Sequence, residues 1–557
     1  MTLRHKMSSV DTAWLRMDRP SNLMMIVGVL MFEGHVDYDR LTATIVARIA
    51  PFNRFRQTVA VDESGAWWVD LPPSRDAFDF DYHLQRAQLP GDAGKEALEA
   101  YAAARVSEPL DPSRPLWQMT LIDNYMGGSA LVVRIHHCIA DGIALVGVML
   151  KLTDQSPDAE HEIVRDLAAT ALSATDSSAI ASGDDDASAD TQPKSGDDET
   201  DFWKQLIAPM TAAAIRTIGA SGVAVSKSLE MIAQPEKATH YAKIATAVAT
   251  EVARLVAMPD DSATRFKGKP GYAKTVAWSE PMPLDIVKAA GRVLDGSVND
   301  VLLSCVAGAL RGYLIDNGDD PDGVEIRAMI PVNLRHPEPS AADGSAASQR
   351  ASNARALGNR FGLVALSLPL GIANPIARLV EVRARMDALK GSYQAPVTLG
   401  VLGLVGMAPK IVQTQVLNLL AKKATAVMTN VPGPQLPLYM AGARLDQMMF
   451  WVPQSGDIGV GVSILSYNGG VQLGLVSDAA LVPDPASIVE RFEPEFERLL
   501  LAVMMSPRDA DAIDPAAAES AIFGTWQPDR RYPTSAGRKM KQVSPRRRSR
   551  HQAVAAP

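Results

Sequence analysis

Two adjacent histidines stand in a stretch of the chain whose residue types are suited to proton transfer. The stretch "LVVRIHHCIADGIAL" (131–145) places His136 and His137 directly after an apolar run, and Asp141 and Gly142 follow shortly afterwards. A neutral imidazole can take a proton from a hydroxyl near neutral pH, because its ordinary pKa of about 6.5 leaves most of it uncharged. The pair therefore predicts either a general base or two histidines held by structural hydrogen bonds.

Two other chemistries fit this stretch poorly. Neighbouring side chains of a strand point to opposite faces, so the two imidazoles diverge, and the sequence has no CxxC or HExxH motif to complete a metal site. For the same reason Cys138 cannot converge on His137 as a nucleophile and base, and we expect it to be a small packed residue. We predict no metal centre.

The histidine pair ends what reads as a buried strand. "SALVVRIHH" follows a tight turn predicted at Gly127-Gly128, and "DGIALVGVMLKL" has the length and character of a buried helix. Residues 1–170 thus read as an α/β unit with the histidine motif at a strand end. Further elements are expected at 22–32 (strand), 38–50 (helix), 66–70 (strand) and 117–123 (strand).

A second α/β unit is expected over residues 271–505. Its predicted elements are a helix at 297–318, strands at 325–335 and 359–370, a hairpin over 457–478 that turns at Asn468-Gly469-Gly470, and a helix at 483–503. The fold class is therefore α/β, with two units of similar size.

Three segments outside these units differ in composition. Residues 171–201 are acidic and lack periodicity, which predicts a disordered linker, and residues 506–557 read as a mostly disordered basic tail. Residues 202–270 read as a helical connector, rich in Ala, Ile and Val up to about residue 258. These helices either pack on a neighbouring unit or lie on a lipid surface.

The composition of the chain is that of a globular protein and argues against a disulfide-rich, secreted or integral membrane protein. Hydrophobic residues make up 47% and charged residues 21%, as in ordinary globular proteins. Two cysteines cannot build a disulfide framework, the first twenty residues lack the apolar core of a secretory signal, and the longest apolar run (397–407) is too short to cross a bilayer. We expect a cytoplasmic protein that is not integral to a membrane.

The form His-His-x-x-x-Asp-Gly is the motif of the CoA-dependent acyltransferase superfamily. The chain also carries "RPLWQMTLID" (114–123), "SVNDVLL" (297–303), "IPVNLR" (330–335) and "TNVPGP" (429–434), in that order. Together these motifs resemble those of bacterial wax ester synthase/acyl-CoA:diacylglycerol acyltransferases. The resemblance implies two chloramphenicol-acetyltransferase-like mixed-sheet domains with the active site at their interface.

The resemblance also implies roles for the motif residues. His137 would be the base that takes the proton from an alcohol while the oxygen attacks an acyl-CoA thioester, and His136 would support the geometry. Asp141 would pair with an arginine, for which we select Arg335. Asn299 is selected as an oxyanion donor, with a helix N-cap as its alternative role.

The remaining motif residues are expected to position the fold. Pro115 would fix the chain while Leu116 and Trp117 enter the core, and Pro432, Gly433 and Pro434 would form a rigid turn at the domain junction, near the CoA entrance. Gly142, Asp300 and Asn430 complete this positioning set. Residues 399–423 would either line an acyl tunnel or pack as ordinary helix.

The implied reaction joins a fatty alcohol or diacylglycerol to a long-chain acyl group from acyl-CoA, which is a co-substrate rather than a bound cofactor. The enzyme would lie peripherally on the inner membrane or on lipid inclusions, and the basic tail (530–550) would attract anionic lipid. No nucleic-acid motif accompanies that tail. The alternatives are a superfamily O-acyltransferase that uses another alcohol, and a non-catalytic lipid-droplet coat protein.

Overall fold

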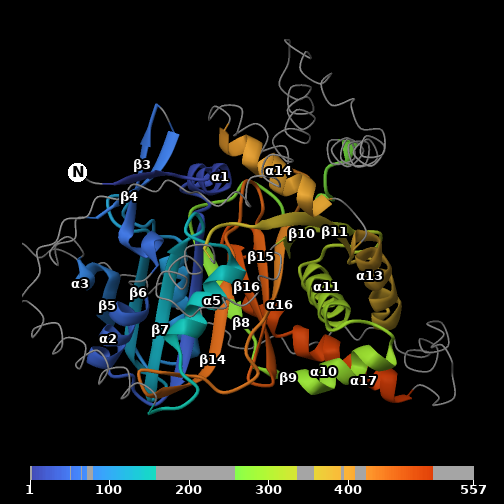
Figure 1. Cartoon of the computed structure of the whole chain (residues 1–557). Helices are drawn as coiled ribbons and strands as arrows, with labels where there is room; N and C mark the ends of the chain where they lie inside the picture. Colours follow the sequence, from blue (N-terminus) through green and yellow to red (C-terminus); the bar gives the residue numbers. More distant parts are fainter. Residues whose placement is uncertain are drawn as a thin grey trace, which may run out of the picture.

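The computed structural model describes residues 3–49, 52–63, 65–71, 79–158, 257–334, 357–390, 394–407 and 422–505. Two β-sheets stand side by side in this part of the chain, with helices packed around them (Figure 1). The acidic linker, most of the helical connector and the basic tail that the sequence predicts lie outside the described residues.

The first sheet is built around β7 (Gly128–His136), which is buried along its whole length. A strand that is apolar on both faces needs a neighbour on either side, and β7 pairs antiparallel with β2 and with β6. The described strands run in the order β13, β14, β2, β7, β6 and β5. Their bounds are β13 (Tyr439–Met440), β14 (Ala443–Trp451), β2 (Met25–Glu33), β6 (Trp117–Tyr125) and β5 (Leu84–Ala87).

The hairpin between β6 and β7 turns one residue earlier than predicted. Met126 and Gly127 are its central residues, with φ angles of 46° and 80°, and Tyr125 pairs with Gly128. Two central residues with positive φ are typical of the type I′ turn that fits a twisted hairpin. Gly128 instead opens β7, where a Cβ would lie 2.6 Å from the carbonyl oxygen of Phe32.

The second sheet mixes parallel and antiparallel pairs. Its described strands run in the order β11, β10, β12, β15, β16 and β8, and the short β9 pairs with β16. The hairpin between β15 and β16 turns at Asn468 and Gly469, which confirms the predicted turn. The bounds are β11 (Phe361–Pro369), β10 (Glu325–Asn333), β12 (Ala426–Pro432), β15 (Val460–Tyr467), β16 (Gly470–Asp478), β8 (Lys274–Trp278) and β9 (Met282–Pro283).

The chain passes from the second sheet into the first. After β12 the chain leaves the second sheet, and β14 pairs antiparallel with β2 of the first sheet. Gly28 makes this pairing possible, because a Cβ there would lie 2.1 Å from the ring of Phe450. A strand of the predicted second unit thus completes the first sheet, which the sequence did not suggest.

Helices cover both sheets. On the first unit lie α2 (Tyr38–Ile49), α3 (Phe80–His83), α4 (Lys95–Val106) and α5 (Gly142–Leu152). On the second unit lie α10 (Leu284–Val293), α11 (Val298–Asp316), α13 (Pro375–Lys390), α16 (Ala486–Val489) and α17 (Phe492–Met505). Among the described residues, α11 alone is long and apolar enough to cross a membrane, and 72% of it is buried inside the protein.

The helix predicted at 483–503 is two helices. α16 ends at Val489 and α17 begins at Phe492. Pro494 explains the break, because it has no N–H to continue a helical ladder and is tolerated only in a first turn.

A small third sheet and two helices complete the part near the histidine pair. The strands β1 (Arg4–Lys6), β4 (Gly65–Asp70) and β3 (Gln57–Asp62) form this sheet, and the 3-10 helix η1 (Asn53–Arg56) precedes β3. Helices α1 (Ser9–Met17) and α14 (Gln394–Met407) pack against each other at the top of the view (Figure 1).

Candidate active site

The histidine pair is held by the ends of two neighbouring strands. The backbone N–H of His136 donates to the carbonyl of Leu116 at 2.9 Å, and that of His137 donates to Met24 at 2.7 Å. Both side chains are buried, at 2% and 5% exposure. Because β7 ends between these two contacts, the two rings leave the strand in different directions.

His136 faces away from the base and toward Asp18. Its Nδ1 accepts the backbone N–H of Cys138 at 3.1 Å, so its proton lies on Nε2, 3.6 Å from Oδ2 of Asp18. The other oxygen of Asp18 accepts the N–H of Met24, whose carbonyl holds His137. His136 therefore braces the turn that holds its neighbour.

The tautomer of His137 follows from its contact with Asn359. Nδ2 of Asn359 donates to Oδ1 of Asp11 and to the backbone carbonyl of His137, both at 2.8 Å. Neither acceptor can donate, so the amide must turn its oxygen toward the ring, where Oδ1 lies 2.8 Å from Nδ1. Nδ1 carries the proton, and Nε2 keeps a free lone pair.

The orientation of Asn359 is fixed by an ion pair between the buried Asp11 and the partly buried Arg54. Oδ2 of Asp11, which is 1% exposed, lies 2.9 Å from Nη2 of Arg54. Arg54 also donates to the carbonyl of Ile139 at 2.8 Å, just beyond the histidine pair. The other oxygen of Asp11 accepts from Nδ2 of Asn359, which keeps the amide in one orientation.

The surroundings of His137 favour a neutral ring. Burial lowers its pKa to about 4, against the opposing effect of the nearby Asp141 carboxylate. The indole of Trp14 stacks on the imidazole with a centroid distance of 4.1 Å and an interplanar angle of 13°. The ring of Phe361, tilted by 45°, has its centroid 5.7 Å from that of the imidazole. The ring is thus a neutral base with one fixed proton.

Both carboxylate oxygens of Asp141 accept backbone N–H groups of the chain. Its side chain caps α5 by accepting the N–H of Ala144 at 3.0 Å, and its other oxygen accepts the backbone N–H of Arg360 at 3.0 Å. Arg335, the predicted partner, lies outside the described residues. Gly142 is the first residue of α5, and a Cβ there would meet nothing within 4 Å.

The sequence "RPLW" places the end of the neighbouring strand. The carbonyl of Pro115 accepts the backbone N–H of Trp117. Leu116 is buried, and its carbonyl accepts the backbone N–H of His136. The indole of Trp117 donates to the carbonyl of Phe55 at 2.9 Å and stacks on His83. These residues fix the start of β6, to which the backbone of His136 is hydrogen-bonded.

Asn299 and Asp300 begin α11, and neither is its N-cap. Ser297 caps the helix, and Asp300 closes a capping box by accepting the N–H of Ser297 at 2.7 Å. The exposed Asn299 instead accepts a hydrogen bond from Nδ2 of Asn430. The structure thus brings the Asn-Asp and Asn-Val-Pro-Gly-Pro motifs together and shows no contact of Asn299 with His137.

Pro432, Gly433 and Pro434 stand where the chain leaves the second sheet. A Cβ on Gly433 would lie 2.3 Å from the carbonyl oxygen of Ser466, which accepts the N–H of Gly433 at 2.9 Å. The carbonyl of Pro434 accepts the N–H of Asn468. This turn fixes the departure of the chain toward β13.

Comparison with known proteins identifies the family. The model of the wax ester synthase/diacylglycerol acyltransferase catalytic domain matches residues 7–302, and the model of the WS/DGAT C-terminal domain matches residues 357–500. The chain belongs to the WS/DGAT family. It is an O-acyltransferase.

A curated relative agrees with this assignment. The "Probable diacylglycerol O-acyltransferase tgs1" of Mycobacterium tuberculosis is 24% identical over 505 residues, which cover 89% of this chain and 95% of the relative.

Solved structures agree with the fold. The wax ester synthase/diacylglycerol acyltransferase from Marinobacter aquaeolei VT8 aligns with a TM-score of 0.56 at 17% identity, over 90% of this chain and 100% of that one. The first condensation domain of the CDA synthetase aligns with a TM-score of 0.53 at 16% identity, over 89% and 96%. The predicted chloramphenicol-acetyltransferase-like architecture is confirmed.

Four residues of this WS/DGAT site were missed from the sequence: Asp11, Trp14, Arg54 and Asn359. One signal was present. Asp11 lies on the same face of α1 as the apolar Trp14, three residues later, where a charged residue requires a buried partner. A polar Asn359 directly before the apolar strand β11 was a weaker signal.

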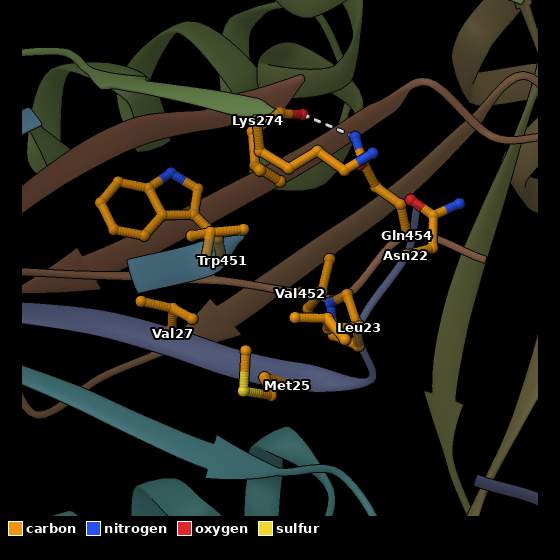
Figure 2. A pocket seen from close by; sticks show the side chains of 11 residues that line it. Asn22, Leu23, Met25, Val27, Lys274, Trp451, Val452 and Gln454 are labelled. Carbon is orange, nitrogen blue, oxygen red and sulfur yellow. Dashed lines mark hydrogen bonds between the residues drawn. The ribbon is translucent and has the colours of Figure 1, made fainter. Parts of the chain in front are cut away.

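The cavity in Figure 2 is separate from His137. It lies between the two sheets, is lined by Met25 and Val27 of β2 and by Trp451 and Lys274, and has room for about one water molecule. Lys274 pairs with the buried Asp478 at 2.7 Å. Among the described residues, no group of three or more His, Cys, Asp or Glu side chains gathers to hold a metal.

Proposed function

We propose that this protein transfers a long-chain acyl group from acyl-CoA to the hydroxyl of diacylglycerol, with His137 as the general base. One observation carries the proposal. The Asn359 amide fixes the Nδ1 proton of a buried neutral histidine and leaves Nε2 as its basic atom.

The chemistry balances without another catalyst. Nε2 of His137 takes the hydroxyl proton while the oxygen attacks the thioester carbonyl carbon, which forms a tetrahedral adduct. The adduct collapses with cleavage of the C–S bond, and the imidazolium returns its proton to the leaving CoA thiolate. The products are an ester and free CoA. General-base action of this kind contributes about 10²–10⁴-fold in rate.

The site supports the transient imidazolium although the resting ring is neutral. Oδ1 of Asn359 accepts the Nδ1 proton in both charge states, the Trp14 indole covers one ring face, and Asp141 provides a negative charge nearby. An amide partner gives orientation without the strong pKa rise that a carboxylate would cause.

Diacylglycerol is the favoured acceptor because the curated relative carries that activity in its name. A fatty alcohol, giving a wax ester, is the second candidate, because the family includes wax ester synthases. Another alcohol, or a non-catalytic coat role on lipid droplets, is an outcome of the experiment below.

The acceptor would be met at the surface of the inner membrane or of lipid inclusions in the cytoplasm. Leu501, Met504 and Met505 at the end of α17 are each more than half exposed, as is Val293 on the adjoining α10. Exposed apolar side chains gathered on neighbouring helices mark surfaces that meet lipid or protein. The basic residues at 530–550 would add attraction to anionic lipid of about 1 kcal/mol each.

Release of CoA from palmitoyl-CoA tests the proposal. We expect ester formation with dioleoylglycerol, compared in parallel with hexadecanol, and a loss of at least about 10²-fold in His137→Gln. CoA release at the background rate by both native and variant protein would leave the coat role, and equal release above background would exclude His137 as the base. Activity with short or polar alcohols alone would assign a different O-acyltransferase.

Vesicle flotation tests the lipid contact. We expect Leu501→Glu with Met504→Glu to reduce binding to vesicles that contain anionic lipid, whereas Val61→Glu on the distant β3 does not. Equal binding by both variants would contradict this surface.

A further inference from the structure

Trp14 carries a buried hydrogen-bond donor that has no partner among the described residues. The side chain is 7% exposed, and its Nε1 makes no hydrogen bond to any residue that the structure describes. Its ring stacks on the imidazole of His137, nearly parallel and at 4.1 Å between centroids. An unused N–H thus belongs to the ring that is stacked on the proposed base.

The surroundings of the Trp14 indole differ from those of two other buried indoles. Trp68 and Trp451 also hold a buried Nε1 that has no partner within the described part of the chain. Trp68 lies under the guanidinium of Arg54, and Trp451 lines the cavity of Figure 2. Of the three, only the Trp14 indole stacks on the general base, so only its N–H is suited to a group that arrives with the substrate.

The reaction creates a group of the right kind. When the alcohol oxygen adds to the thioester, the carbonyl oxygen gains negative charge and needs a hydrogen-bond donor. A donor that already lies in a dry site needs no reorganisation when this charge appears. The alcohol oxygen must lie within hydrogen-bond reach of Nε2 of His137. The oxyanion forms two bonds away from that oxygen, in the neighbourhood of the stacked rings of His137 and Trp14.

The structure holds the indole rigidly in this place. Asp11 and Trp14 are three residues apart on α1 and share one face of the helix. Asp11 binds Asn359, the residue that sets the tautomer of His137. The N-cap Ser8, whose hydroxyl accepts the N–H of Asp11 at 3.1 Å, fixes the start of the helix. One face of α1 therefore carries both the residue that binds Asn359 and the residue that stacks on His137.

We infer that Trp14 is a catalytic residue, whose Nε1–H donates to the oxyanion of the tetrahedral adduct. This inference rests on the proposed acyl transfer and deepens it. It replaces Asn299, the donor selected from the sequence, which instead pairs with Asn430 at the start of α11.

Trp14→Phe tests the inference, because phenylalanine keeps a stacking ring and removes the N–H. We expect kcat with palmitoyl-CoA and dioleoylglycerol to fall about 10²-fold, as for loss of one oxyanion donor, with KM little changed. Trp451→Phe is the matched control, since it removes an equally buried, unpartnered indole N–H elsewhere. We expect its kcat to match that of the native protein.

A second replacement guards against misfolding. β-(3-Benzothienyl)alanine at position 14 preserves the bicyclic shape and lacks only the N–H, and we expect the same loss of kcat with a native melting temperature. A native kcat in either Trp14 variant would overturn the inference, as would a rise in KM alone, which would indicate a ground-state contact. Inactive His137→Gln beside fully active Trp14→Phe would reject this inference and leave the proposed function intact.

Discussion

The amide oxygen of Asn359 lies 2.8 Å from Nδ1 of His137, although the two residues are 222 positions apart in the chain. His137 ends a strand of the first sheet, and Asn359 precedes β11 of the second. The base is therefore complete only when the two sheets are docked. This contact joins fold and chemistry, because the same amide that bridges the sheets decides which nitrogen of the ring is basic.

Removing the Asn359 amide should leave His137 free to adopt either neutral tautomer. In Asn359→Leu the Nδ1 proton loses its acceptor, so both neutral tautomers become accessible, and we expect kcat to fall by roughly 10²-fold. Steady-state kinetics measures the loss. Asn124→Leu is the control, because the Asn124 side chain also makes two backbone hydrogen bonds, to Leu89, but lies outside the site. Equal losses in both variants would mean that Asn359 only stabilises the fold.

The sequence predicts local structure well where one element decides it. The buried β7, the helix after Asp141 and the turn at Asn468-Gly469 follow from apolar runs and turn residues. The position of His137 at a strand end follows from the same pattern. These features depend on neighbours in sequence.

Features that depend on distant pairs were not predicted. The pairing of β14 with β2 needs Gly28 to admit the Phe450 ring, and neither residue indicates this alone. The role of Asn359 needs Asp11 and Arg54 to orient it, from three separate segments of the chain. A single sequence gives the residue types but not their convergence.

Asp141→Ala should damage folding as much as turnover. The change removes the cap of α5, worth about 1 kcal/mol, and leaves the N–H of Arg360 without its acceptor, worth about 1–3 kcal/mol. Urea unfolding should show a loss of about 2–4 kcal/mol, and Asp141→Asn, which keeps an acceptor oxygen, should lose less. A fully stable but inactive Asp141→Ala protein would show a direct role in catalysis.

Gly433→Ala should destabilise the turn between the sheets. The new methyl group would lie 2.3 Å from the backbone oxygen of Ser466, which cannot move without disturbing β15. We expect a loss of about 1–3 kcal/mol in the free energy of unfolding. Gly147→Ala in α5 is the control, since a Cβ there meets nothing within 4 Å and alanine favours a helix. Equal stability of the two variants would contradict the close approach at Gly433.

The activity of the native enzyme should persist at mildly acidic pH. Burial lowers the pKa of His137 to about 4, so the folded protein keeps a neutral base well below the ordinary value of about 6.5. We expect kcat/KM to stay level from pH 8 to about pH 5 as far as His137 is concerned. A half-maximal value near pH 6.5 in fully folded protein would contradict the buried base.

The same shift should make stability fall with acid. Burial also lowers the pKa of His83 to about 4, and its Nδ1 lies 2.8 Å from the carbonyl of Trp117. Between pH 6.5 and 4 the unfolded chain binds protons that these two folded rings do not, so each ring lowers the free energy of unfolding by up to about 1.4 kcal/mol per pH unit. Above pH 6.5 neither contributes a slope. Urea unfolding at pH 7, 6 and 5 should show this loss, and His137→Gln should reduce it by about half if the two rings contribute equally.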